Sequence, residues 1–414
     1  MDALQPIGQA AQAVLGHPFG HQHPVGHETI PLVICTYFVA WAIYARSHKP
    51  LDLPADKLTH ILYAFANLNS DGRVVLGDPW ADIDKHDEGV PWTDKKELHG
   101  NLRQLGLLKK RHRNLKVSLS IGGWTWSTNF AAVASSSKTR QVFVRTSIEL
   151  MNDLGLDGLD IDWEYPKSHS EGHDYVKLLR ELRHGLDHYA ASKGDSQRYL
   201  LTAAMPCGES NYKQMDLGAM AHYLDYFYLM AYDLAGSWSD RAGHQANLFG
   251  GEQSVHHAVQ HYIRSGVPSR KLVMGMPIYG RAFQNTQGIG HPYQGVGQGS
   301  WEQGVYDYKQ LPLPGAVEYY DQAAGASYSY DGTKGELITY DSPMVLETKS
   351  QYIVDHKLGG AMFWESSADH PTGHHRSILD TIHNAFVRRG QRLDQSLNHV
   401  HYPTSVYENV RQGL

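Results

Sequence analysis

Residues 156–166 read Leu-Asp-Gly-Leu-Asp-Ile-Asp-Trp-Glu-Tyr-Pro, a run that places acids at alternate positions, Asp160, Asp162 and Glu164. The apolar residues between the acids predict a β-strand, in which alternate side chains point to the same face. Carboxylates spaced about 7 Å apart along one face repel each other unless some are protonated or hydrogen-bonded. We therefore expect shared protons and a raised pKa, which would leave Glu164 protonated near neutral pH as a general acid.

Two plainer interpretations fit an acidic run of this kind. One is a strand end whose acids are simply solvated, and the other is a cation site built from three carboxylates. Gly158 inside the run and the closing Trp-Glu-Tyr-Pro make it far more specific than a lone Asp-x-Asp. These features favour a catalytic site.

The acidic run resembles the Asp-x-x-Asp-x-Asp-x-Glu signature of glycoside hydrolase family 18, the chitinases and their relatives, at Asp157, Asp160, Asp162 and Glu164. Further stretches are similar to motifs of the same family and follow in its order: Ser-x-Gly-Gly at Ser120, Gly122 and Gly123, Met230-Ala-Tyr232-Asp233, residues 275–281 and residues 359–364. The resemblance covers about residues 32–390 and is closest to the chitinases of filamentous fungi.

Short apolar runs alternate with amphipathic stretches such as 95–112 and 174–192 along most of the chain. The predicted strands are residues 32–38, 60–66, 116–121, 158–162, 200–204, 226–230, 272–276 and 360–363. Eight strands alternating with helices predict an α/β fold, the (β/α)8 TIM barrel. Active residues of that fold lie at the C-terminal strand ends, where Asp162 and Glu164 fall.

The predicted barrel comprises residues 31–280 and 346–390. Residues 281–345 exceed what one loop and one helix need, and they contain strand-like pieces at 326–330 and 336–340, so they predict a small α+β insertion domain between strands seven and eight. Residues 391–414 are expected to form an irregular C-terminal tail. Residues 1–30 read as a disordered tail rich in Gly, Pro and His, although metal binding is the alternative for its tract of His17, His21, His23 and His27.

Composition restricts the class of protein and its partners. The chain has 414 residues, 41% hydrophobic and 19% charged, which is typical of an ordinary globular enzyme. A net charge of −6 and the absence of a long apolar segment argue against nucleic-acid and membrane partners. The basic residues 109–113 close a helical pattern, where cations suit the helix end. We expect a monomer.

The start of the chain and its two cysteines bear on localisation. No basic start with an apolar core is visible, and Cys35 and Cys207 lie in or beside apolar runs, where free buried thiols are expected. These features point to a cytoplasmic protein or one exported without a signal peptide. A protein whose signal had been removed would look the same and would be extracellular.

Tryptophans follow three of the predicted strands and should ring one mouth of the barrel, where aromatic faces cover the apolar C–H faces of sugar rings. They are Trp124, Trp238 and Trp364. Trp41, Trp80, Trp92, Trp126 and Trp301 are weaker candidates, and Trp163 alternates away from the acids and should be packing. The full set of predicted substrate-binding residues is Tyr37, Phe65, Trp124, Met230, Asp233, Trp238, Arg281 and Trp364, with a structural salt bridge as the alternative for Arg281.

The resemblance implies a retaining, substrate-assisted hydrolysis of the β-1,4 bonds of chitin and chitooligosaccharides, without a metal or organic cofactor. It makes Glu164 the acid and base, and gives Asp162 the task of orienting the acetamido group while Asp160 shares a proton with it. Tyr232 would donate to the acetamido oxygen and Trp364 would form the floor beneath the sugar. Asp157 is expected to be scaffolding. Fungal cell-wall remodelling, autolysis and nutrition are all compatible roles.

Two other functions belong to the same family. Some members are lectins that keep the fold and lack the glutamate, whereas this chain keeps Glu164 with both aspartates. Others are endo-β-N-acetylglucosaminidases acting on glycoprotein glycans, which generally lack the insertion predicted here. Both features therefore favour the chitinase.

Overall fold

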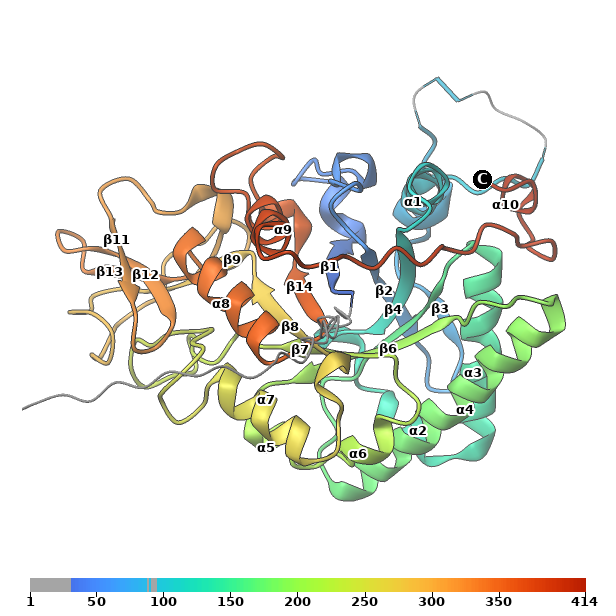
Figure 1. Cartoon of the computed structure of the whole chain (residues 1–414), viewed down its shortest axis with the longest axis horizontal. Helices are drawn as coiled ribbons and strands as arrows, with labels where there is room; N and C mark the ends of the chain where they lie inside the picture. Colours follow the sequence, from blue (N-terminus) through green and yellow to red (C-terminus); the bar gives the residue numbers. More distant parts are fainter. Residues whose placement is uncertain (1–30, 88, 91–94) are drawn as a thin grey trace, which may run out of the picture.

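A closed barrel of eight parallel strands forms the centre of the protein, seen in a computed structural model that describes residues 31–414 apart from residues 88 and 91–94 (Figure 1). The His tract and Trp92 lie outside the described residues. Around the barrel the order is β1-β14-β8-β7-β6-β5-β4-β2, and pairing of β1 with β2 closes it. The strands are β1 (Val33–Val39), β2 (His60–Leu68), β4 (Lys116–Gly122), β5 (Gly158–Asp162), β6 (Leu200–Pro206), β7 (Tyr226–Met230), β8 (Leu272–Pro277) and β14 (Gly360–Trp364). All eight predicted strands are confirmed.

Most residues of these strands are buried, which explains why they read as continuous apolar runs. One face fills the barrel and the other packs under the surrounding helices. These helices are α1 (Gly100–Arg111), α2 (Phe130–Ser135), α3 (Ser137–Asp153), α4 (His169–Lys193), α5 (Glu209–Tyr212), α6 (Leu217–Met220), α7 (Val255–Arg264), α8 (Pro343–Asp355), α9 (Ile378–Arg388) and α10 (Glu408–Arg411). In the described part of the chain, no helix is long and apolar enough to cross a membrane.

A second sheet lies between β8 and α8, at the side of the barrel in Figure 1. Its order is β10-β9-β13-β12-β11, and every pairing is antiparallel. The strands are β9 (Tyr279–Phe283), β10 (Val305–Asp307), β11 (Val317–Asp321), β12 (Ala326–Asp331) and β13 (Glu336–Thr339). The predicted insertion between strands seven and eight is therefore present. Its helical part is short, a 3-10 turn at Tyr308–Gln310.

The C-terminal residues pack across the barrel instead of leaving it (Figure 1). Leu393 bridges Leu32 next to β1. The Asn398 side-chain amide donates to three carbonyl oxygens at and beyond the end of α1, those of Lys109, His112 and Leu115. Carbonyls at a helix end lack partners within the helix, so Asn398 closes α1 while it fixes the tail.

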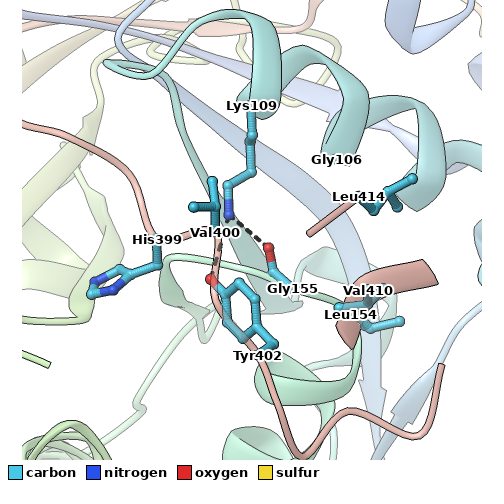
Figure 2. A pocket seen from close by; sticks show the side chains of 9 residues that line it. All are labelled: Gly106, Lys109, Leu154, Gly155, His399, Val400, Tyr402, Val410 and Leu414. Atoms are coloured by element: carbon cyan, nitrogen blue, oxygen red, sulfur yellow. Dashed lines mark hydrogen bonds between the residues drawn. The ribbon is translucent and has the colours of Figure 1, made fainter. Parts of the chain in front are cut away.

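Asp157 joins this tail to the N-terminal end of β5. One carboxylate oxygen accepts from the Val117 amide at 2.7 Å and lies 2.8 Å from the Lys109 ammonium, and the other accepts from the His399 amide at 2.7 Å. Lys109 also donates to the carbonyl of Gly155 beside a cavity of about 20 Å³ (Figure 2). Burial lowers the pKa of Lys109, and the nearby Asp157 carboxylate opposes that shift. Asp157 therefore has the scaffolding place that the sequence indicated, far from the end of β5 that carries Asp162.

The Asp157–Lys109 pair predicts a stability effect without a catalytic one. Asp157→Asn leaves a buried ammonium without its counter-charge, which should lower the free energy of unfolding by about 3 kcal/mol. The exposed pair Arg145–Glu149 provides the control, because Glu149→Gln should cost less than about 0.5 kcal/mol. Urea unfolding followed by circular dichroism measures both variants. A large loss of turnover in folded Asp157→Asn would contradict this assignment.

Candidate active site

Asp160 is buried in the barrel and fully hydrogen-bonded. Its carboxylate accepts from the hydroxyls of Tyr37 at 3.0 Å, Ser120 at 2.7 Å and Thr202 at 2.7 Å, which come from β1, β4 and β6. Burial raises the pKa of Asp160, and these three donors oppose the shift. Both oxygens are therefore engaged by hydroxyl groups, an arrangement that suits a buried carboxyl better than it suits a cation ligand.

Asp162 ends β5, and Glu164 follows two residues later at the same end of the barrel. Burial first, and then the charges of Glu164 and Asp160, raise the pKa of Asp162 well above its usual value. Oxygen Oδ1 of Asp162 has no hydrogen-bond partner within the described protein. Burial also raises the pKa of Glu164 to about 7, with a contribution from the charge of Asp233, while a hydrogen bond to Tyr165 opposes it. Burial thus raises the pKa of all three acids, the direction that we expected from their alternation.

The loop after β4 fixes the position of Glu164. The Glu164 amide donates to the Ser127 hydroxyl at 2.8 Å, and that hydroxyl lies 2.9 Å from the carbonyl of Gly123. Gly122 has φ +110°, and a Cβ placed there would meet the carbonyl oxygen of Asp162 at 2.3 Å. Gly122 is therefore required because the loop runs against the end of β5, and Gly123, with φ +81°, is required because a Cβ there would meet the Phe65 ring at 2.7 Å.

Tyr232 lies just beyond β7 and is buried, with 8% of its surface exposed. Its ring meets that of Tyr279 edge to face, at 6.1 Å between centroids. Burial raises the pKa of Tyr232 well above its usual value, and the charges of Asp233 and Asp162 add to the shift. The hydroxyl therefore keeps its proton and is available as a hydrogen-bond donor beside the acids.

Asp233 binds the first strand of the insertion to the barrel. Its carboxylate accepts from the Tyr279 hydroxyl and from Nε of Arg281, each at 2.6 Å. The Arg281 guanidinium lies 4.7 Å from the Trp238 ring, which is 59% exposed. The salt bridge that was the alternative for Arg281 is thus present, and it places Arg281 beside Trp238.

The predicted aromatic residues occupy different depths. Trp364 is partly buried, with its ring 5.7 Å from Phe65 and 5.1 Å from Tyr37 between centroids. Trp124 is 76% exposed, whereas Tyr37 is fully buried with its hydroxyl on Asp160. Tyr37 is therefore a buried hydrogen-bond donor to Asp160. Met230 is partly buried. The side chains of Trp41, Trp80 and Trp301 are exposed. Trp163 packs on Phe130, as predicted.

Four residues of the site were not identified from the sequence, namely Ser127, Thr202, Tyr165 and Tyr279. Ser127 and Tyr165 lie within a few residues of the Gly-Gly and acidic motifs, so proximity in sequence was a usable signal. Thr202 gave no such signal, because it reaches Asp160 only across the β5–β6 pairing. The described residues contain no group of His, Cys, Asp or Glu arranged to hold a metal ion.

Comparisons with known proteins agree with this geometry. A family model described as glycosyl hydrolases family 18 matches residues 33–369. The chain is 44% identical to Chitinase 1 of Aphanocladium album, over 98% of this chain and 97% of that protein. It is 45% identical to Endochitinase 1 of Metarhizium robertsii, over 92% and 91%. The catalytic domain of a psychrophilic chitinase B from Arthrobacter superposes with a TM-score of 0.81 at 28% identity, over 89% of this chain and 98% of that one.

The raised pKa of Glu164 predicts a pH dependence with a defined sign. If the protonated acid is required, kcat/KM on a neutral oligosaccharide should fall as pH rises above about 7. The free energy of unfolding should also decrease as pH rises from 4.5 to about 7, because in this range the folded protein keeps a proton that the unfolded chain releases.

Asp233→Asn tests the part of this shift that comes from a neighbouring charge, which adds to the larger effect of burial. The substitution removes a nearby negative charge and frees the positive charge of Arg281, and both changes lower the pKa of Glu164. The basic limb of the pH profile should therefore move to lower pH. A limb that stays in place or moves upward would contradict this electrostatic account.

Proposed function

This chain belongs to family 18 of the glycosyl hydrolases, and from this premise we propose that it cleaves the β-1,4 bonds of chitin with Glu164 as acid and base. The chain is a chitinase, in keeping with the relatives that match it along nearly their whole length. The observation that carries the residue assignment is the row formed by the buried Asp160 and Asp162 and the partly buried Glu164, in which the outermost acid has a pKa of about 7.

The first step breaks the glycosidic bond. Glu164 gives its proton to the leaving oxygen while the carbonyl oxygen of the substrate's own N-acetyl group bonds to the anomeric carbon. The electron pair of the broken bond stays on the leaving sugar, and a cyclic oxazolinium intermediate forms. Tyr232 donates a hydrogen bond to the acetamido oxygen and holds it in line for this attack.

The second step regenerates the enzyme. Water attacks the anomeric carbon from the face that the leaving group vacated and gives a proton to Glu164. The bond between that carbon and the acetamido oxygen breaks, its electron pair returns to the acetamido group, and the product keeps the β configuration. Asp162 accepts from the acetamido N–H and stabilises the positive charge on the ring, a task that suits an oxygen with no protein partner. Asp160 holds Asp162 in a proton-sharing pair.

Aromatic residues supply the sugar-binding surface. Trp364 forms the floor beneath the distorted sugar, and the exposed Trp124 and Trp238 provide faces for neighbouring sugars. Phe65, Met230 and Arg281 are further contacts on the same side of the barrel. We propose that the enzyme acts on chitin and chitooligosaccharides as a monomer.

Glu164→Gln tests the proposed function directly. The amide keeps the size and hydrogen bonding of the side chain but cannot release a proton, so turnover of a chitin hexasaccharide should fall by about 10²–10⁴-fold. Affinity measured by titration calorimetry should change little. Glu149→Gln, at an exposed site on α3, is the control and should retain full activity. Turnover close to wild type in Glu164→Gln would remove the acid from its assigned role.

Asp162→Asn and Tyr232→Phe separate the acetamido contacts from general binding. Both should lower kcat more than they raise KM, by about tenfold or more, because their contacts strengthen as charge develops on the ring. Tyr226→Phe, at the other end of β7, should behave like the wild type. Unchanged kcat in Tyr232→Phe would exclude that hydroxyl from the mechanism.

A further inference from the structure

A buried charge cluster joins three distant parts of the chain next to Trp364. Arg46 lies in the segment that follows β1, and its Nη1 is 3.3 Å from Oδ1 of Asp307 and 3.4 Å from Oε1 of Glu365. The three side chains are 18%, 6% and 8% exposed, so the cluster is largely removed from water. One guanidinium therefore holds two carboxylates, one from the insertion and one from the barrel.

Each carboxylate is linked to a tryptophan, one through the backbone and the other through a hydrogen bond. Glu365 directly follows Trp364, and it also accepts from the Ser367 amide at 2.9 Å. Asp307 ends β10 and accepts from Nε1 of Trp301 at 2.9 Å. The Arg46 guanidinium lies 5.0 Å from the Trp301 ring, which is 49% exposed. Arg46 thus connects the partly buried tryptophan of the barrel to an exposed tryptophan of the insertion.

The balance of charge makes Arg46 necessary for this arrangement. Burial and the neighbouring Asp307 raise the pKa of Glu365, while Arg46 lowers it. Lys309 is the other cation near Asp307, at 3.7 Å, and its ammonium donates to the carbonyl of Ser367. Without Arg46, two buried carboxylates would lie near each other with only the ammonium of Lys309 beside Asp307. Like charges in such a site drive the groups apart.

The same combination occurs a second time where the insertion meets the barrel. Asp233 of the barrel pairs with Arg281 of β9, and the guanidinium lies 4.7 Å from the exposed ring of Trp238. In both places an aspartate and an arginine from opposite sides of the junction meet, and an exposed tryptophan covers the arginine. The insertion is therefore fixed to the barrel through β9 and through β10.

We propose that Arg46 is a positioning residue for the substrate site, which holds Trp364 and Trp301 in one fixed relation through Glu365 and Asp307. The inference rests on the proposed function, because it assigns Trp364 to the sugar. Arg46 touches no reacting atom. It keeps Trp364, in the floor of the site, and Trp301, on the insertion, in fixed positions relative to each other. A chitin chain then binds to a preformed surface.

Arg46→Gln tests this role in the full-length protein. The substitution removes the charge while keeping a polar side chain, and kcat/KM for a chitin hexasaccharide should fall about tenfold or more, because small misplacements of a binding site lower the rate strongly. The double variant Arg46→Gln/Asp307→Asn should recover part of this loss, since one of the two facing carboxylates is then neutral. Arg145→Gln, at an exposed ion pair, should match the wild type.

Two further measurements keep the test decisive. If Arg46→Gln does not fold, Arg46→Lys keeps the charge but lacks the planar fork, and its kcat/KM should fall several-fold at an unchanged Tm. If the wild type itself releases no product, the proposed function fails, and the junction is then judged by calorimetry, where Arg46→Gln should weaken hexasaccharide binding about tenfold. Folded Arg46 variants with wild-type kcat, KM and affinity would overturn the inference.

Discussion

Burial of carboxyl groups at one end of β5 is the constraint on which the rest of the site depends. A buried charge is expensive unless it is paired, hydrogen-bonded or neutralised by a proton. Asp160 is satisfied by hydroxyls from three other strands, so the strands around it must carry Tyr37, Ser120 and Thr202 at those positions. Asp162 and Glu164 have fewer donors and are held instead with raised pKa values. The raised pKa values are thus a consequence of where the barrel places its acids.

The acids at the two ends of β5 lie in opposite electrostatic environments. Asp157, at the N-terminal end, meets the ammonium of Lys109 and the amides of Val117 and His399, and its role is to bind helix α1 and the C-terminal residues to the barrel. Glu164, just beyond the C-terminal end, has a pKa that burial and the charge of Asp233 raise to about 7, while a hydrogen bond to Tyr165 opposes the shift. A cation at one end favours scaffolding, and crowded carboxyls at the other favour acid catalysis. The acid at the N-terminal end of β5 therefore serves stability, and the acids at its C-terminal end are those that we propose for catalysis.

The barrel could be predicted from the sequence because its strands are buried and read as apolar runs. Strands that are short or exposed could not. β3 (Val74–Leu76) is an apolar run of only three residues, too short to stand out as a strand. β11 is an exposed edge strand that reads Val-Glu-Tyr-Tyr-Asp and has no continuous apolar pattern. The acids were identified because their spacing repels, and Cys35 and Cys207 are free and buried as expected. The contacts of Tyr37 with Asp160 and of Arg46 with Glu365 depend on closure of the barrel, which no local pattern encodes.

We propose that the acids act on a sugar whose own acetamido group serves as the nucleophile, with Glu164 on one side of the bond. The anomeric form of the first product tests it most directly. We would add a chitin hexasaccharide to the wild-type protein and follow the reducing-end protons by NMR before mutarotation. The account predicts that the newly released reducing ends appear as the β-anomer. Initial release of the α-anomer would show that water attacks directly with inversion, and it would contradict the account.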